Sequence, residues 1–293
     1  MNDRFTIVGL GELLWDLFPD GPRFGGAPAN FACHAAALGA DAYLVSSVGR
    51  DELGRKGQEA LLAHDVHADC LAVCDIAPTG TVDVTLDNAG KAQFRFASDV
   101  AWDHLQWSEP VERLAGRCAA VCFGTLAQRG AVSRSTIRRF VSATSPTALR
   151  IFDINLRPPY YDDNTIRESL DLANVLKLND EELPIVASLC GLSGTDTELL
   201  ALLAKQFELD VVALTRGPHG ALLWRRGVLS DAGGLPVVVR DTVGAGDAFT
   251  AAMAIGLIRN EPLDVINQRA CQVAAYVCSC SGATPELPDE IKR

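Results

Sequence analysis

The sequence contains no apolar run long enough to cross a membrane and no cluster of basic residues. Its 26 lysines and arginines are outnumbered by 37 aspartates and glutamates, which gives a formal net charge of −11. A chain with this charge is repelled by nucleic acid and by anionic membrane surfaces. We therefore expect neither nucleic acid nor a membrane among its partners. A nucleotide is not excluded, because it needs only local hydrogen-bond donors, a metal and one or two cations.

The cysteines also lack the pattern of a disulfide framework. There are nine, an odd number, and they are scattered through apolar segments as buried reduced thiols usually are. No secretory hydrophobic region precedes the strand-like segment 5–9, so we expect a cytoplasmic protein. Segment 64–74 carries two histidines and two cysteines at spacings that a metal site could use. A helix end, a turn and a strand there would separate these side chains, and ordinary packing is the favoured interpretation.

Two common nucleotide-binding motifs are missing. The segment Gly9-Leu10-Gly11 is only part of a dinucleotide fingerprint, because Leu14 stands where the third glycine should be. The sequence contains no Gly-x-x-x-x-Gly-Lys-Ser/Thr loop either. Neither a Rossmann dehydrogenase nor a P-loop kinase is predicted.

Strand-like apolar runs alternate with helical segments along the chain. The runs cover residues 5–10, 42–48, 119–124, 149–153, 175–178 and 211–214. This alternation predicts a doubly wound α/β fold with a mostly parallel sheet flanked by helices. With 293 residues and 48% hydrophobic composition, one large core accounts for residues 1–293 as a single domain. In segment 79–96 apolar and polar residues alternate instead, which predicts an exposed β-hairpin with its turn at 88–90.

The most informative segment is Asp-Thr-Val-Gly-Ala-Gly-Asp, residues 241–247, which precedes an uncharged apolar run long enough for a helix, 248–258. Backbone N–H groups at a helix N-terminus are unsatisfied and carry partial positive charge, so the turn predicts a phosphate site. Gly244, Ala245 and Gly246 let an anion approach the main chain closely. Asp247 would stand beside that anion, with its pKa lowered by the helix dipole. The alternative is an ordinary loop with an N-cap aspartate.

A second glycine-rich segment, Phe-Gly-Gly-Ala-Pro-Ala-Asn at residues 24–30, lies before a small-residue helical pattern that ends at Gly39. Together with the downstream segment 241–247, it resembles the paired signatures of the PfkB, or ribokinase-like, sugar kinases. The resemblance extends from Gly9 to Pro285. In that family a small β-sheet forms a lid over the sugar and often pairs two subunits. The resemblance therefore implies a ribokinase-like fold with a discontinuous lid at about 13–27 and 79–98, and a homodimer through that lid.

The resemblance also implies catalytic roles. Asp247 matches the family's base, which accepts a proton from a primary hydroxyl of the sugar as that oxygen attacks the γ-phosphorus of ATP. The amides of residues 244–246 would hold the charge that develops on the transferred group. Asn179 and Glu182 match an Asn-x-x-Glu element that helps to organise Mg²⁺, partly through water. Acidic residues in an ordinary first helical turn are the alternative for this pair.

For ATP, the resemblance implies contacts from a set of strand-end and loop residues: Arg157, Asn179, Thr215, Gly217, Gly220, Gly244, Gly246 and Gly282. Arg157 follows a strand and supplies a planar cation that can clamp a phosphate, although a surface arginine would look the same. Many relatives hold a K⁺ ion behind the anion turn. Asp241 and Val243 occupy the matching positions.

For the sugar, the positions that match the family's contacts are Asp16, Gly26, Asn30, Phe96 and Asp247. Asn30 could equally be a helix cap, and Asp16 a turn residue. The segments Gly-Glu-Leu-Leu-x-Asp, Gly-Gly-Ala-Pro-Ala-Asn and Asp-x-Asn-Leu-Arg-Pro-Pro look most like those of fructokinases. D-fructose is therefore the predicted acceptor. The alternative activities are those of a ribokinase, a nucleoside kinase and a 2-keto-3-deoxygluconate kinase. A catalytically silent sugar sensor would be expected to lack the base or the glycine turn, and both are present.

Overall fold

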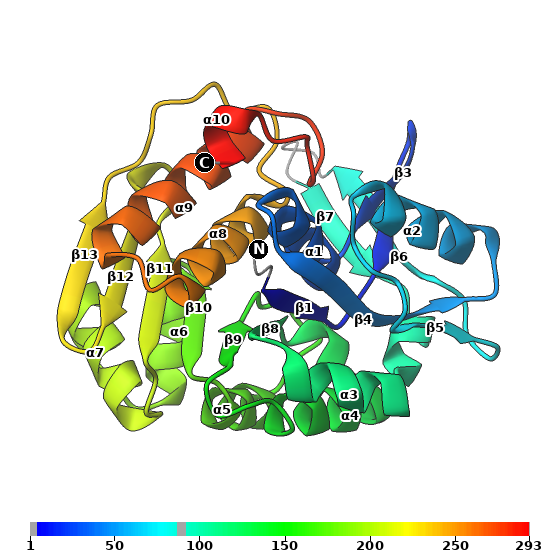
Figure 1. Ribbon diagram of the computed structural model, residues 1–293, viewed down its shortest axis with the longest axis horizontal. Helices are drawn as coiled ribbons and strands as arrows, with labels where there is room; N and C mark the ends of the chain where they lie inside the picture. The colour runs from blue at the N-terminus through cyan, green and yellow to red at the C-terminus, as the bar shows by residue number, and fades with distance from the viewer. Residues whose placement is uncertain (1–4, 87–91, 293) are drawn as a thin grey trace.

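The computed structural model describes residues 5–86 and 92–292, and a nine-stranded sheet forms its centre (Figure 1). Neighbouring strands from β11 to β5 pair in parallel, and β12 and β13 extend one edge by antiparallel pairing. The strands, in order across the sheet, are β13 (Val228–Ala232), β12 (Ala221–Arg225), β11 (Val211–Thr215), β10 (Val175–Asn179), β9 (Leu149–Asp153), β8 (Ala120–Phe123), β1 (Thr6–Leu10), β4 (Asp41–Gly49) and β5 (Leu71–Cys74).

Helices cover both faces of this sheet, which is why the central strands are apolar at nearly every position. Ile7 of β1 packs into the core on one face, while Val8 packs into the core on the other. The first face is covered by α1 (Ala27–Ala37), α2 (Glu52–Ala63), α8 (Ala245–Ile258), α9 (Leu263–Cys278) and α10 (Asp289–Lys292). The second is covered by α3 (Glu109–Arg117), α4 (Ala131–Ser142), α5 (Asp163–Leu172), α6 (Glu182–Leu189) and α7 (Asp196–Gln206).

A separate four-stranded sheet lies beside α1 and α2 (Figure 1). Its order is β3 (Gly21–Gly25), β2 (Leu14–Phe18), β6 (Gly80–Leu86) and β7 (Ala92–Phe96). The strands come from the two segments that were predicted to form a small sheet. β6 and β7 pair antiparallel, as expected for a hairpin. The turn predicted at 88–90 lies outside the described residues.

The strand order places a ligand-binding crevice near β1. From β1 the chain proceeds to β4 and β5 on one side, whereas β8, β9, β10 and β11 follow one another on the other side. Loops that leave β1 and β8 therefore diverge, and ligands of open α/β sheets bind outside the carboxyl ends of the strands at such a point. Glu12 follows β1, Arg157 follows β9 and Asn179 ends β10, so all three belong to this edge.

The doubly wound α/β prediction is confirmed, and each of the six predicted strands agrees with the structure to within one residue at either end. Three short structural elements complete the chain: the 3₁₀ helices η1 (Ala101–His104), η2 (Leu126–Gln128) and η3 (Gly217–His219). Over 5–86 and 92–292, no helix is both long and apolar enough to span a bilayer. The same residues contain no cluster of three or more side chains suited to hold a metal. His67, within segment 64–74, instead bonds Asp41 at 2.8 Å and stacks on Tyr43.

Candidate active site

The predicted anion turn is built tightly around Gly244. Helix α8 begins at Ala245, three residues earlier than predicted, and Gly244 is its N-cap with a left-handed φ of 80°. A Cβ on Gly244 would lie 2.2 Å from the carbonyl oxygen of Ala283, so only glycine fits. Within the described residues, the N–H groups of Gly246 and Asp247 donate to no carbonyl. The turn therefore presents free donors at the positive end of a helix.

The carboxylate of Asp241 ties this turn to the loop after α9. One of its oxygens accepts from the N–H of Val243 at 3.0 Å, and the other accepts from the N–H of Gly282 at 3.2 Å. The carbonyl of Ala283, next along that loop, lies 2.9 Å from Nε2 of His34 in α1. Three distant segments of the chain thus fix the position of the turn.

Asp247 lies in the first turn of α8, and its Oδ2 accepts a hydrogen bond from Asn30 Nδ2 at 2.9 Å. Burial, followed by the nearby charge of Asp153, raises the pKa of Asp247 to about 6, while the Asn30 hydrogen bond opposes the rise. The prediction that the helix dipole lowers this pKa is therefore wrong. Desolvation outweighs the dipole at this half-buried side chain.

Two further carboxyl groups share this edge of the sheet with Asp247. Burial raises the pKa of Glu12 to about 7 and that of Asp16, on β2, to about 6. The Arg157 guanidinium is close enough to lower the pKa of all three groups. Three carboxyls at this edge of the sheet therefore share the influence of one cation, Arg157. This arrangement suits a ligand rich in hydroxyl groups, each of which can both donate and accept.

Two buried oxygens in this group have no hydrogen-bond partner among the described residues: Glu12 Oε2 and Asn30 Oδ1. A buried polar atom left without a partner is costly, and a bound ligand is a common reason for one. Glu12 was not among the residues predicted to contact a ligand. Its signal was an acidic residue between a buried strand and an apolar Leu-Leu pair, a position where a charge is unfavourable unless it is used. Glycine is required at position 26, because a Cβ there would lie 2.5 Å from the backbone oxygen of Glu12.

A buried ion pair next to the turn was also not predicted from the sequence. Nζ of Lys177 on β10 donates to Asp153 Oδ1 at 3.0 Å, and Thr250 Oγ1 on α8 donates to Asp153 Oδ2 at 3.0 Å. A Cβ on Gly246 would lie 3.1 Å from the Lys177 nitrogen, so the ammonium group is directly against the turn. The signal in the sequence was a lysine inside an otherwise apolar strand, Val-Leu-Lys-Leu.

The Asn179 and Glu182 pair forms a compact cap between β10 and α6. Asn179 Oδ1 accepts from the N–H groups of residues 181 and 182, both at 2.9 Å. The Glu182 carboxylate accepts from the N–H of Leu156 at 2.8 Å and from that of Asn179 at 2.9 Å. With all three oxygens engaged by backbone, the pair fits contact with hydrated Mg²⁺ through water better than direct ligation.

The other residues predicted to contact the nucleotide follow β11 and α9. Thr215 ends β11, and Gly217 begins the 3₁₀ turn η3 with a left-handed φ of 52° and open space around its Cα. Gly220 has a packing role, since a Cβ there would lie 2.0 Å from the backbone oxygen of Ala232. Gly282 is adjacent to the anion turn through its bond to Asp241.

Phe96, which was predicted to contact the sugar, and Trp15, which precedes Asp16, have different surroundings. Phe96, at the end of β7, is half-buried and packs edge-on against Tyr160, with ring centroids 5.3 Å apart. Trp15 is buried, and its Nε1 donates to the backbone oxygen of Leu53 at 3.0 Å. Trp15 therefore packs β2 against α2. Phe96 remains the candidate for contact with a ligand.

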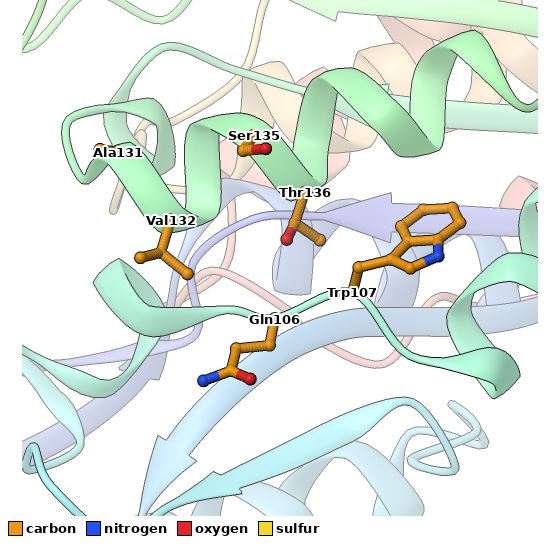
Figure 2. Close-up of a pocket in the computed structure, with 6 residues that line it drawn as sticks. All are labelled: Gln106, Trp107, Ala131, Val132, Ser135 and Thr136. Atoms are coloured by element: carbon orange, nitrogen blue, oxygen red, sulfur yellow. The ribbon is translucent and has the colours of Figure 1, made fainter.

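A shallow surface pocket lies elsewhere, between residues 106–107 and helix α4 (Figure 2). Its lining residues, Gln106, Trp107, Ala131, Val132, Ser135 and Thr136, include no charged side chain. Helix α4 covers the face of the sheet opposite to α8. This pocket therefore contributes nothing to the carboxyl-rich site.

The fold and the site together define a class of α/β phosphotransferase in which a glycine turn at a helix N-terminus stands beside a buried carboxyl group. Residues 21–290 match the family model described as "pfkB family carbohydrate kinase". The chain belongs to this family, and it is a carbohydrate kinase.

Individual relatives match this chain over nearly its whole length. It is 32% identical to a fructokinase of Klebsiella pneumoniae, with 100% of this chain and 99% of that protein covered. It is 30% identical to a fructokinase of Salmonella typhimurium, with 98% and 97% covered. Among solved structures, the fructokinase of Vibrio cholerae O395 with fructose, ADP and calcium ion is 25% identical with a TM-score of 0.79, over 97% and 96% of the two chains. An uncharacterized sugar kinase from Pyrococcus horikoshii is 28% identical with a TM-score of 0.81, over 95% and 93%.

Proposed function

We propose that this carbohydrate kinase transfers the γ-phosphoryl group of ATP to the primary hydroxyl of D-fructose, giving fructose 6-phosphate. The observation that carries the proposal is the contact of Asn30 with Asp247 beside the free N–H groups of the glycine turn. It joins a proton acceptor to an anion site, which phosphoryl transfer requires in one place. The fructokinases among the relatives support fructose as the acceptor.

In this proposal Asp247 accepts the proton of the attacking hydroxyl, and Asn30 keeps its carboxylate oriented. The turn 244–246 holds the charge on the transferred group, chiefly through the free N–H of Gly246. Glu12, Asp16, Gly26 and Asn30 surround the sugar, and Phe96 covers its apolar face. Asn179 and Glu182 would hold the water ligands of Mg²⁺, which would supply positive charge against the phosphates. The nucleotide lies along Thr215, Gly217, Gly220 and Gly282.

Arg157 supports a second candidate substrate class. Its guanidinium is close to Glu12, Asp16 and Asp247, so it stands on the acceptor side of the site. There it could bind the carboxylate of a sugar acid such as 2-keto-3-deoxygluconate. Fructose remains the proposal because Arg157 also offsets the charge of the three carboxyls when the substrate is neutral.

A substrate panel tests the proposal. The purified protein with Mg-ATP should release ADP only when an acceptor is added, and fastest with fructose among common hexoses. Faster turnover of 2-keto-3-deoxygluconate, ribose or a nucleoside would contradict the fructose assignment and leave the carbohydrate kinase class intact. Sugar binding without any turnover would indicate a sensor.

The pKa of Asp247 predicts the acid side of the pH profile. Asp247 accepts a proton only when it is ionised, so kcat/KM should fall as pH decreases through about 6. Because Glu12, with a pKa of about 7, is already protonated when Asp247 titrates, Glu12→Gln should leave this fall at the same pH. Initial rates from pH 5 to 8 measure both profiles. If the fall disappears in Glu12→Gln, the titrating group is Glu12 rather than Asp247.

We also propose that a monovalent cation orders the glycine turn from behind. The Asp241 carboxylate and the carbonyl of Val243 supply oxygen ligands of the type that K⁺ prefers, and Asp241 already connects the turn to Gly282. Initial rates in K⁺ should exceed those in a bulky organic cation at matched ionic strength. Asp241→Ala should abolish this difference. Equal rates for the unaltered enzyme would remove the ion from the mechanism.

Two further proposals concern the setting of the enzyme. The four-stranded sheet has free edges at β3 and β7 in the described chain, and we propose that this sheet is a lid that pairs two subunits. Its segments, about 13–27 and 79–98, then belong to one ribokinase-like domain. All nine cysteines are free thiols, which agrees with a cytoplasmic location.

A further inference from the structure

Three buried side chains connect two central strands to the anion turn. Lys177 on β10 donates to Asp153 on β9, and Thr250 on α8 donates to the other oxygen of Asp153. The Thr250 hydroxyl also lies 2.9 Å from the backbone oxygen of Gly246. Lys177 and Asp153 are almost fully buried, with side-chain exposures of 8% and 6%. The sheet therefore holds the first turn of α8 through polar contacts as well as apolar packing.

The Lys177 ammonium group is directed toward the turn. A Cβ on Gly246 would be 3.1 Å from its nitrogen, so the glycine leaves room for it. Of its three N–H donors, the described residues accept one, at Asp153. Burial lowers the pKa of Lys177, but the carboxylates of Asp153 and Glu182 more than offset this, and the net shift is upward. The group is therefore a permanent cation at the anion site.

Stability alone does not explain this cation. A buried ion pair recovers little more than the cost of removing two charges from water, and apolar residues of similar size often serve as well. β10 is otherwise apolar, and leucine at 177 would continue its pattern. The position of the ammonium group next to Gly246 gives it a function that an apolar residue could not supply.

We propose that Lys177 is a positioning residue for phosphoryl transfer: through Asp153 and Thr250 it fixes the Gly246 turn, and its ammonium group supplies a fixed positive charge behind that turn. The inference rests on the proposed kinase reaction at this site. Negative charge on the transferred group is stabilised most when the surrounding dipoles and charges are already in place. Lys177 should therefore contribute more to the transition state than to binding of the nucleotide.

The test compares Lys177→Met with the double variant Lys177→Met/Asp153→Asn. The single variant leaves Asp153 charged and buried, whereas the double variant removes both charges and keeps the shapes of both side chains. Leu203→Ala on α7 is the stability control, because it opens a cavity on the other face of the sheet without touching the turn. Each protein is assayed for kcat and KM. Each is also titrated by calorimetry with Mg-ADP alone and with Mg-ADP plus aluminium fluoride, which mimics the transferred phosphoryl group.

Both Lys177 variants should lose about 100-fold in kcat, as when one donor to a developing oxyanion is removed. Their affinity for Mg-ADP alone should stay within about threefold of the unaltered protein, while the affinity gained by adding aluminium fluoride should be lost. Leu203→Ala should melt at a lower temperature with kcat unchanged. If the double variant recovers normal kcat and normal aluminium fluoride affinity, Lys177 serves only to neutralise Asp153, and the inference is overturned.

If the single variant does not fold, the double variant alone tests the inference. Failure of the kinase proposal is a separate result, because it would appear as no turnover of any sugar by the unaltered protein. In that case the aluminium fluoride titration still reports whether Lys177 supports anion binding at the turn.

Discussion

Replacing Asp247 with asparagine should reduce kcat by about 10²-fold to 10⁴-fold while Mg-ADP still binds. Asparagine keeps the shape of the side chain, and its oxygen can still accept the hydrogen bond from Asn30 Nδ2. It cannot accept a proton from the attacking hydroxyl. The loss should therefore appear in turnover and not in nucleotide affinity, which steady-state kinetics and calorimetry measure separately.

Asp264→Asn provides the matched control for this variant. Asp264 lies in the first turn of α9, so the same chemical change is again made in a first helical turn, but on an exposed side chain. Its kcat should be unchanged. An Asp247→Asn enzyme with near-normal kcat would show that another group accepts the proton, with Glu12 as the next candidate.

The second large effect is expected from Gly244→Ala. The new methyl carbon would lie 2.2 Å from the Ala283 carbonyl oxygen, and φ at this residue is 80°. The turn must shift to relieve that contact, and a displacement of about 1 Å at a reacting centre can lower the rate by about 10²-fold. We expect kcat/KM to fall by at least about that factor, together with a decrease in the free energy of unfolding measured in urea.

Gly227→Ala separates the two causes. Gly227, in the turn between β12 and β13, has φ of 86°, yet a Cβ there would meet nothing within 4 Å. This variant carries the left-handed backbone cost, about 1–2 kcal/mol, without the steric contact. It should lose stability and keep normal kcat/KM. Equal activity of the two alanine variants would mean that the packing of Gly244 on Ala283 is not needed for turnover.

The strands and the anion turn could be predicted from sequence because their signals are local. The predicted bounds of segment 149–153 match β9, and the apolar residues at its centre, Ile151 and Phe152, are buried. Gly244 could be identified because a left-handed N-cap and a close backbone contact both require glycine. The antiparallel edge strands β12 and β13 were not predicted. Their alternating pattern is weak and is interrupted by charged residues.

The electrostatics of the site could not be predicted in the same way. The pKa of Asp247 depends on burial and on Asp153, which is far away in the sequence, whereas the helix dipole is the only contribution that the local sequence reveals. The role of Lys177 depends equally on a neighbour from another strand. Residue identity indicates which groups can be charged, but the charge that each one holds is set by tertiary packing.

The contact between Asn30 and Asp247 joins residues 217 positions apart. Because α1 is made early and α8 is made late, the base cannot be oriented until most of the chain has left the ribosome. Loop closure over such a separation is entropically costly and comes late in folding. An unfinished chain therefore holds neither the anion turn nor its aspartate, and it cannot use ATP although the strands of the four-stranded sheet are already made. Competence for catalysis is thus one of the last properties that this protein acquires during its synthesis.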